Sequence, residues 1–450
     1  MMRLIGLGLT VFFYTSVAAQ DNSPYSRYGL GDVVPNHNIV SRGMGSIAAG
    51  FTDFQTVNFT NPASYGNLSY ASPTDIRLNP AYQRSTIFEF GAEMDRKTLK
   101  TYTPSSNFTS RNLVIPYIQM GFPIKMIKAN KKGIFLGADF SLKPVYRINY
   151  QIAKIDSLQG VDSFSTVYNG DGGLHEVSGG LGIRIKNLSL GFNAGFAFGK
   201  KEYSTNLTFL SLRTPYFAST SSTNTNFNGT FFNAGFQYEI DLKNKSTIVL
   251  GGYGNLQQTL KGSQDNIRQT VYTDLGGEKV TIDSVFSNNV KGEIIRPSSF
   301  TVGFTYRDGA GHLLFGADYE ATKWADYRFY GQPDSVVNNY KIKAGVEYYP
   351  ASNNTPLKNY FSFVRYRFGF NFGPDYVKVN NALPEYGITF GAGFPLKIRR
   401  SFYETESSIL NTAIEFGSRG NKNSNYKENT VRISIGFSMS DLWFRRYKYD

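Results

Sequence analysis

Alternation between apolar and polar residues is the feature that most limits what this chain can fold into. In Ser85–Met94, the aromatic residues Phe88 and Phe90 alternate with the carboxylates Glu89 and Glu93. A period of two places the two sets on opposite sides of a β-sheet. The pattern therefore predicts a strand with one apolar face and one polar face.

The same alternation returns along the rest of the chain, for example in Gly191–Lys200, Phe361–Phe372 and Val431–Met439. These stretches often run for about ten residues, the length that a tilted strand needs to cross a membrane. In a membrane barrel the apolar set faces lipid and the other set faces the lumen. A soluble β-sandwich also alternates and is the alternative fold. Long strands whose second face is small or charged favour an all-β transmembrane antiparallel barrel.

Composition agrees with a barrel that needs no disulfides. The 450 residues include no cysteine, although small exported proteins often carry disulfides. The mean hydropathy is −0.31, and the chain contains 31 Tyr and 37 Phe. These values suit strands with one wet face and aromatic girdles at the two membrane interfaces.

The net charge of +13 raises the question of a nucleic-acid partner. Lys and Arg are scattered singly at alternate strand positions and in connections, without a basic run or a known binding motif. We therefore expect no nucleic-acid partner. The charges are expected in a polar lumen and at the rims, near the headgroups of outer-membrane lipid and lipopolysaccharide.

The first nineteen residues are typical of a secretory signal peptide. Arg3 gives the positive start, Leu4–Tyr14 gives the apolar core, and Val17 and Ala19 are small residues before the cut. A transmembrane anchor is the alternative, but the apolar run is shorter than the roughly 20 residues that a helical span needs. We expect a cleaved signal peptide over residues 1–19, with the exported chain beginning at Gln20.

The spacing of turns predicts how the strands are connected. Short turns occur near Lys186–Asn187 and Asp308–Gly311, whereas polar stretches such as Asn206–Asn224 and Gly262–Asn289 are expected to be long loops. Short turns that alternate with long loops are typical of outer-membrane barrels. The pattern predicts about fourteen strands, an even number in the usual range.

A glycine-rich stretch before the strands fits neither the pattern of a strand nor that of a helix. It runs from Gly43 to Leu68 and is too irregular for a strand and too rich in glycine for a stable helix. The motif Gly-Met-Gly-Ser-Ile-Ala-Ala-Gly, followed by Asn-Pro-Ala, resembles the N-terminal hatch of the FadL family of outer-membrane channels. The resemblance implies a plug inside a fourteen-stranded barrel, with hatch residues Gly43, Gly45, Asn61, Pro62 and Ala63. A loop-rich cap on an ordinary β-protein is the alternative.

The resemblance also predicts how the chain is divided and where an apolar ligand would bind. Residues 20–72 would form the N-terminal segment and hatch, and residues 73–450 the outer-membrane barrel. Apolar residues of the hatch are candidates for ligand contact, namely Phe51, Phe54, Phe59 and Tyr65.

Two prolines interrupt otherwise clear strands. Pro116 lies in the second predicted strand and Pro144 in the third. A proline cannot donate to the strand ladder, so each one marks an edge, a bulge or a break. In FadL-like channels a kink in the third strand opens a lateral gap in the wall, which makes Pro144 the candidate for such an opening. A tolerated bulge is the ordinary alternative.

The chain carries no recognisable catalytic or metal-binding motif. His37, His175 and His312 are far apart in sequence, and none lies in a nucleophile motif or at metal-ligand spacing. We therefore expect no enzyme activity, no cofactor and no metal.

Two functions remain open from the sequence. The FadL resemblance implies an outer-membrane channel for passive uptake of hydrophobic molecules, such as long-chain fatty acids, through a hatch-gated and lateral route. The alternative is a non-transporting accessory barrel in a larger outer-membrane complex for type IX protein secretion or for barrel assembly. Fold-level analogy alone does not separate these functions.

Overall fold

The computed structural model describes most of the chain. The described residues are 22–53, 55–69, 85–102, 105–124, 132–159, 161–210, 216–273, 279–352, 355–356, 358–379, 381–396, 407–424 and 426–441. The expected signal peptide and its cleavage point before Gln20 lie outside them.

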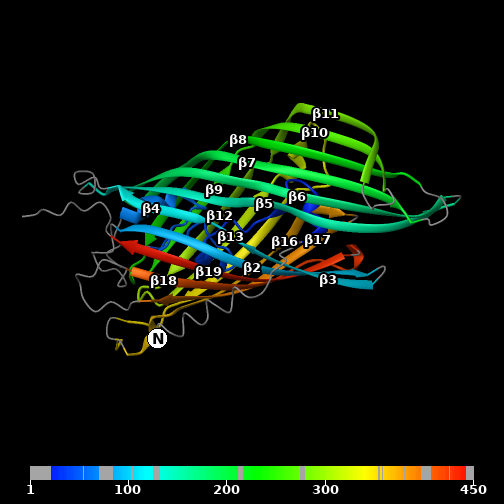
Figure 1. Ribbon diagram of the computed structural model, residues 1–450. Coiled ribbons are helices and arrows are strands. Elements are labelled where there is room, and N and C mark those ends of the chain that lie inside the picture. The colour runs from blue at the N-terminus through cyan, green and yellow to red at the C-terminus, as the bar shows by residue number, and fades with distance from the viewer. Residues whose placement is uncertain are drawn as a thin grey trace, which may run out of the picture.

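The described strands form a closed antiparallel barrel (Figure 1). The strands of its wall are β2 (Thr86–Tyr102), β3 (Ser105–Val114), β4 (Ile118–Ile124), β5 (Ile134–Leu158), β6 (Val161–Ile185), β7 (Leu188–Phe209), β8 (Ala218–Asp241), β9 (Thr247–Asn255), β10 (Gln258–Thr273), β11 (Lys279–Arg296), β12 (Ser299–Arg307), β13 (Leu313–Thr322), β14 (Arg328–Phe329), β15 (Asn339–Tyr348), β16 (Arg365–Val379), β17 (Asn381–Pro395), β18 (Ser407–Gly420) and β19 (Tyr426–Asp441).

Interruptions explain why the labels outnumber the strands of the wall. β3 continues as β4 along β2, and β9 continues as β10 along β8. β11 and β12 follow β10 and β9, and β13 and β14 follow β12 and β11, so each of these pairs is also one interrupted strand. Counted this way, the described wall has fourteen strands, as the sequence predicts. The last strand closes on the first, from Tyr426 opposite Thr101 to Asp441 opposite Thr86.

The two faces of the wall follow the alternation in the sequence. On β2, Phe90 is 44% exposed while Glu89 is 1% exposed. On β19, Ile435 is exposed and its neighbour Ser434 is buried. The outward residues are mainly Phe, Leu, Ile and Tyr, so the barrel has the apolar girdle that lipid contact requires. The inward residues include many polar and charged side chains and glycines, together with a buried apolar cluster that contains Leu174, Phe231 and Leu260.

A charge on the outer face tests this assignment. Ile435 lies in the middle of the outward apolar series of β19, so Ile435→Arg should destabilise the barrel by about 2–4 kcal/mol. Ile435→Leu keeps the apolar contact with lipid and should be nearly neutral. Denaturant titration of both variants in lipid vesicles measures the difference, and an equal loss for the two would refute the assignment of faces.

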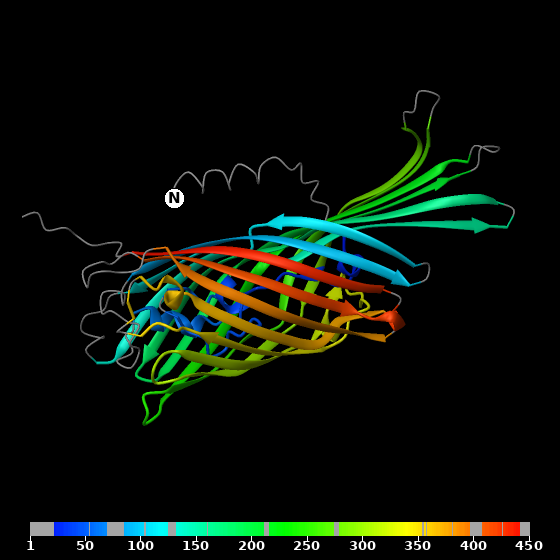
Figure 2. The ribbon, with the colours of Figure 1, turned by 90° about the horizontal axis from the view of Figure 1, so that it is seen from below.

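The wall strands are longer than predicted at one end of the barrel. Gly262–Asn289 is not a loop, because residues 262–273 belong to β10 and residues 279–289 to β11. Asn206–Asn224 is also mostly strand, shared between β7 and β8. These strands run with β5 and β6 beyond the rest of the barrel as one sheet (Figure 2). We call this end the hairpin end and the end that carries the Lys186–Asn187 turn the turn end.

The described residues 22–69 form an N-terminal segment inside the barrel (Figure 1). It contains η1 (Pro24–Arg27), β1 (Asp32–Val33), α2 (Ile39–Arg42) and η2 (Pro62–Ser69). The short helix α2 begins after Asn38, whose side chain accepts a hydrogen bond from the Ser41 backbone N–H at 2.8 Å. Packing of α2 against β17, β18 and β19, and of η2 against β4 to β8, places the segment within the lumen.

Short 3₁₀ turns complete the described fold, at η4 (Trp324–Asp326), η5 (Tyr360–Phe363) and η6 (Lys422–Ser424). In the described part of the chain, no helix has both the length and the apolar character to cross a membrane.

Candidate functional site

The glycine-rich motif lies directly against the wall. Gly45 has a φ of +66°, and its N–H donates to Thr389 Oγ1 of β17 at 2.9 Å. A little further on, the N–H groups of Ala48 and Ala49 both donate to the Asp318 carboxylate of β13, at 2.6 and 2.9 Å. Two strands of the wall, β13 and β17, therefore hold the two ends of the motif.

Close backbone contact explains the glycine at position 43 and its partners in the wall. A Cβ on Gly391 would lie 2.9 Å from the Gly43 Cα, and a Cβ on Gly369 would lie 1.9 Å from the Gly45 N. Such distances leave no room for a side chain on either surface. Glycines of the segment and of the wall thus let two backbones meet.

The Asn-Pro-Ala motif forms the start of η2. Asn61 Nδ2 donates to the Ala49 carbonyl at 2.7 Å, and its Oδ1 accepts from the Ala63 N–H at 3.1 Å. Pro62 begins the 3₁₀ helix and lies against Gly191 of β7, where a Cβ would be 2.3 Å from the Pro62 carbonyl. The motif therefore joins the glycine-rich stretch to the wall.

The apolar residues that the sequence offers as ligand contacts are packed rather than open. Phe51, Phe59 and Tyr65 are 1%, 2% and 0% exposed. The Tyr65 hydroxyl donates to Asn193 Oδ1 at 3.0 Å, and Phe51 packs in a cluster with Met44 and Ile47. Phe54 lies outside the described residues. A role in ligand binding stays a prediction, since these side chains occupy the core of the segment.

A buried ion network ties α2 to the wall. The Arg42 side chain is fully buried, with Nη1 2.5 Å from Glu93 of β2 and Nη2 2.9 Å from Glu415 of β18. Arg432 of β19 shares both carboxylates, at 2.9 and 3.3 Å. Two guanidinium groups and two carboxylates balance in charge, which is what makes their burial tolerable.

A second ion cluster holds the start of the segment. The Asp32 carboxylate lies 3.0 Å from Lys97 of β2 and 2.7 Å from Arg419 of β18, and Arg419 also contacts Asp375 of β16 at 2.7 Å. Burial alone would raise the pKa of Asp32, but Lys97 and Arg419 hold it well below its usual range. Asp32 is therefore charged inside the barrel.

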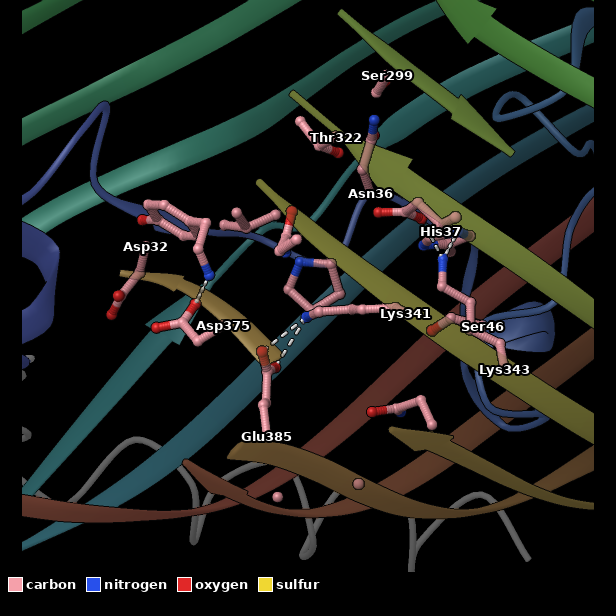
Figure 3. A pocket seen from close by; sticks show the side chains of 18 of the residues that line it. Asp32, Asn36, His37, Ser46, Ser299, Thr322, Lys341, Lys343, Asp375 and Glu385 are labelled. Carbon is pink, nitrogen blue, oxygen red and sulfur yellow. Dashed lines mark hydrogen bonds and ion pairs between the residues drawn. The ribbon is translucent and has the colours of Figure 1, made fainter. Parts of the chain in front are cut away.

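Between the two ion clusters lies a cavity of about 300 Å³. Its lining includes Lys341, which is 2.9 Å from Glu385, and Lys343, which is 2.6 Å from Glu320 (Figure 3). His37 lies beside Lys343, with 3.4 Å between the two nitrogens. Burial, together with the nearby cations Lys343 and Arg42, lowers the pKa of His37 well below its usual range. The imidazole is thus neutral at pH 7.

The cavity offers polar chemistry without a free charge. Each Lys or Arg in its lining has a carboxylate within ion-pair distance, in the pairs Lys97–Asp32, Lys143–Glu176, Arg296–Glu176, Lys341–Glu385, Lys343–Glu320, Arg419–Asp375 and Arg432–Glu415. Over the described ranges, no group of three or more His, Cys, Asp or Glu is arranged to hold a metal ion. Ion pairs therefore share the lining of the cavity with apolar and aromatic residues such as Tyr146, Trp324 and Tyr376.

The other two histidines lie away from the cavity lining. His175 on β6 stacks on Phe198 of β7 with 5.9 Å between ring centroids, and His312 at the turn end contacts the Tyr349 carbonyl at 2.7 Å. The structure therefore does not bring the histidines together.

Pro144 lies at a β-bulge. The β5–β6 register shifts between Pro144 and Tyr146, so that Val145 has no partner on β6. Pro116 falls in the break between β3 and β4. The geometry at Pro144 agrees with the bulge alternative, and whether it opens the wall to the bilayer stays a prediction.

Sequence reasoning missed the charged residues that hold the segment. Arg42 precedes the glycine motif directly, and Glu93 was visible as a lumen-facing carboxylate in the alternating pattern. Nothing in the sequence pairs them, because Arg42 and Glu415 are 373 positions apart. One signal could have suggested the ion pair: on β2 a carboxylate that faces the lumen alternates with aromatic residues that face lipid, and a carboxylate inside a barrel needs a positively charged partner.

Known structures share this fold. The toluene transporter TbuX of Ralstonia pickettii has a TM-score of 0.55 and 13% identity, covering 91% of this chain and 99% of that one. The toluene transporter TodX of Pseudomonas putida has a TM-score of 0.55 and 14% identity, covering 90% and 98%. A FadL homologue of Pseudomonas aeruginosa has a TM-score of 0.50 and 12% identity, covering 92% and 98%. Identities this low show a common fold and no more.

Comparisons of sequence give a single clear result. No curated protein matches the chain. The model of the BamG family, a family of FadL-like barrels, matches residues 1–450, which is the whole chain. The chain therefore belongs to the BamG family.

Proposed function

We propose that this protein is a non-transporting barrel of the outer membrane that serves as an accessory subunit of a barrel-assembly complex. The observation that carries the proposal is the fixed N-terminal segment, which the buried Arg42–Glu93–Glu415–Arg432 network binds to the wall. Breaking a buried ion pair costs about 3–5 kcal/mol. A segment held in this way is a poor gate and a good structural core.

The polar lumen supports the same proposal. A channel for hydrophobic molecules needs an apolar path, because such a solute gains about 25 cal/mol for each Å² kept out of water. In the cavity beside the segment, ion pairs such as Lys341–Glu385 and Lys343–Glu320 interrupt the apolar surface that residues such as Trp324 and Tyr376 supply. The BamG family name agrees with a role in barrel assembly, rather than with the type IX secretion role that the sequence also left open.

The proposal includes how the chain reaches its place of action. Residues 1–19 would direct export and be removed before Gln20, residues 20–72 would fill the lumen, and residues 73–450 would form the wall. The outward apolar girdle would contact outer-membrane lipid and lipopolysaccharide. The sheet that extends at the hairpin end would give a larger protein complex a surface outside the bilayer.

A passive channel for hydrophobic molecules, such as long-chain fatty acids, is the second candidate. The fold shared with the toluene transporters TbuX and TodX favours it, as does the bulge of β5 at Pro144. In this case the N-terminal segment would act as a hatch and Pro144 would mark a side exit.

Two measurements separate the candidates. Liposomes that contain the purified protein should take up a fluorescent long-chain fatty acid no faster than empty liposomes, with the FadL homologue of Pseudomonas aeruginosa as the positive control. Depletion of the protein from cells should cause an unrelated outer-membrane barrel to accumulate in its unfolded, heat-insensitive form on gels. Uptake well above that of empty liposomes, together with normal folding of the reporter barrel after depletion, would overturn the accessory proposal and favour the channel.

A further inference from the structure

The wall contains a seam where two neighbouring strands do not pair. β5 is paired to β6 along its whole length, from Ile134 to Leu158, but its other edge is paired to β4 only as far as Leu142. β3, which would continue the ladder, is paired to β2. Within the described strands, no ladder joins β3 to β5. Figure 2 shows the hairpin of β2 and β3 diverging from β5 and β6 toward the hairpin end.

Residues of the N-terminal segment occupy the edge of β5 that β3 leaves unpaired. Asp32 and Val33 of β1 pair antiparallel with Arg147 and Tyr146, and the Val34 N–H donates to the Val145 carbonyl at 2.9 Å. β6 holds the other edge of β5 throughout, so these bonds use the edge that faces β3. β1 thus stands where a wall strand would stand.

The contact continues toward the hairpin end. The Ser23 N–H donates to the Asn149 carbonyl at 3.0 Å. The Asn22 side chain makes two hydrogen bonds to the Gln151 backbone, accepting from its N–H at 3.1 Å and donating to its carbonyl at 3.2 Å. An unpaired strand edge must find partners for its backbone groups, and here residues 22–34 supply them.

The same residues are also tied to the other side of the seam. Asp32 forms ion pairs with Lys97 of β2 and Arg419 of β18, at 3.0 and 2.7 Å. The Ser23 hydroxyl donates to Glu428 of β19 at 2.7 Å. Residues 22–34 therefore bridge β5 to the strands that lie beyond β3.

We propose that residues 22–34 are a strap that closes the seam between β3 and β5 in place of a β-ladder, with Asp32 as its latch. Backbone bonds hold the strap to β5, and the Asp32 carboxylate holds it to β2 and β18. The strap goes beyond the accessory role, since it closes a lateral route in this barrel whatever complex the barrel serves. A barrel whose strap is released would have an open strand edge and an open side wall.

The absence of cysteine from the chain makes the strap measurable. Val33 and Tyr146 are directly opposite each other, so a variant with Val33→Cys and Tyr146→Cys should form a disulfide in intact outer membranes. For the latch, Val34→Cys reports on the strap, because the Val34 side chain is buried. With Asp32 intact it should react slowly with a membrane-impermeant maleimide.

Release of the latch should expose the strap. Asp32→Asn keeps the size of the side chain and removes its charge, so Val34→Cys should be labelled about tenfold faster or more in this background. Asp171→Asn is the matched control, since Asp171 pairs with Lys200 at exposed positions outside the strap. A heat-modifiable barrel band on gels confirms that each variant has folded.

Two results would overturn the proposal. One is fast labelling of Val34→Cys with Asp32 intact, together with no disulfide between positions 33 and 146. The other is that Val34→Cys is labelled at the same rate with Asp32→Asn as with Asp171→Asn, which would show that Asp32 is not the latch. Neither result bears on the accessory role, because that role is measured by the folding of a reporter barrel.

Discussion

Replacing Arg42 with methionine should lower the free energy of unfolding by about 3–5 kcal/mol, the usual cost of removing one partner from a buried ion pair. The substitution keeps most of the aliphatic volume of the side chain and removes the guanidinium. Glu93 and Glu415 then share Arg432 alone, with one carboxylate in excess inside the barrel. Urea titration of refolded protein in vesicles, followed by Trp fluorescence, measures the loss.

An exposed ion pair provides the matched control. Lys200 lies 3.3 Å from Asp171 and 3.2 Å from Glu202, but its side chain is 49% exposed. Lys200→Met removes the same charge and should cost about 0–1 kcal/mol. Equal losses for Arg42→Met and Lys200→Met would mean that the network around Arg42 does not hold the segment.

A double variant tests the origin of the loss. Glu415→Gln removes the excess negative charge that Arg42→Met leaves behind, so the double variant should be more stable than Arg42→Met alone. A purely steric role for Arg42 predicts no such recovery.

The wall could be predicted because lipid contact imposes a strict pattern. Within the membrane the outer face of each strand must be apolar, and the inner face need not be. The sequence therefore predicts that Phe90 of β2 points outward and that Glu89 points inward, as the structure shows. The count of fourteen strands follows from the same pattern, since each crossing of the membrane needs its own alternating stretch. The glycine motif was visible because close backbone contact excludes side chains at Gly45 and at Gly369.

The strands at the hairpin end could not be predicted in this way. Between Gly262 and Asn289 most residues are polar, and the described residues 281–290 are exposed whichever way they point. A strand with water on both faces carries no period of two, so its sequence looks like that of a loop. These residues form strands nevertheless, because β10 and β11 are paired along their length, from Gln258 opposite Arg296 to Thr273 opposite Lys279.

The content of the lumen was also hidden from the sequence. The resemblance to the FadL hatch predicts Phe51, Phe59 and Tyr65 as ligand contacts, because they are apolar residues of that hatch. In the structure the segment fills its part of the lumen, and each of these side chains is buried in a separate cluster with residues of the segment and of the wall. Ion pairs such as Arg42–Glu415 and Asp32–Arg419 form only when the closed barrel brings distant residues together, so no local sequence pattern predicts them.

Substituting alanine for Gly369 should displace the N-terminal segment from the wall. A Cβ at this position would lie 1.9 Å from the Gly45 N and 2.2 Å from the Met44 carbonyl carbon. Backbone atoms cannot swing aside as a side chain can, and Gly45 is itself held by its φ of +66° and by Thr389. Overpacking usually costs about 1–3 kcal/mol, and we expect about 3 kcal/mol here because the contact is with backbone.

Gly417 provides the comparison that separates displacement from a general loss of stability. It also lines the lumen, but a Cβ there would find its nearest neighbour, in Thr430, at 3.8 Å. Trypsin should therefore cleave after Arg42 in Gly369→Ala, while the barrel still shifts on heating, and should leave Gly417→Ala intact. Equal protection of Arg42 in the two variants would contradict this expectation, because the wall would then have taken up the added methyl group without displacing the segment.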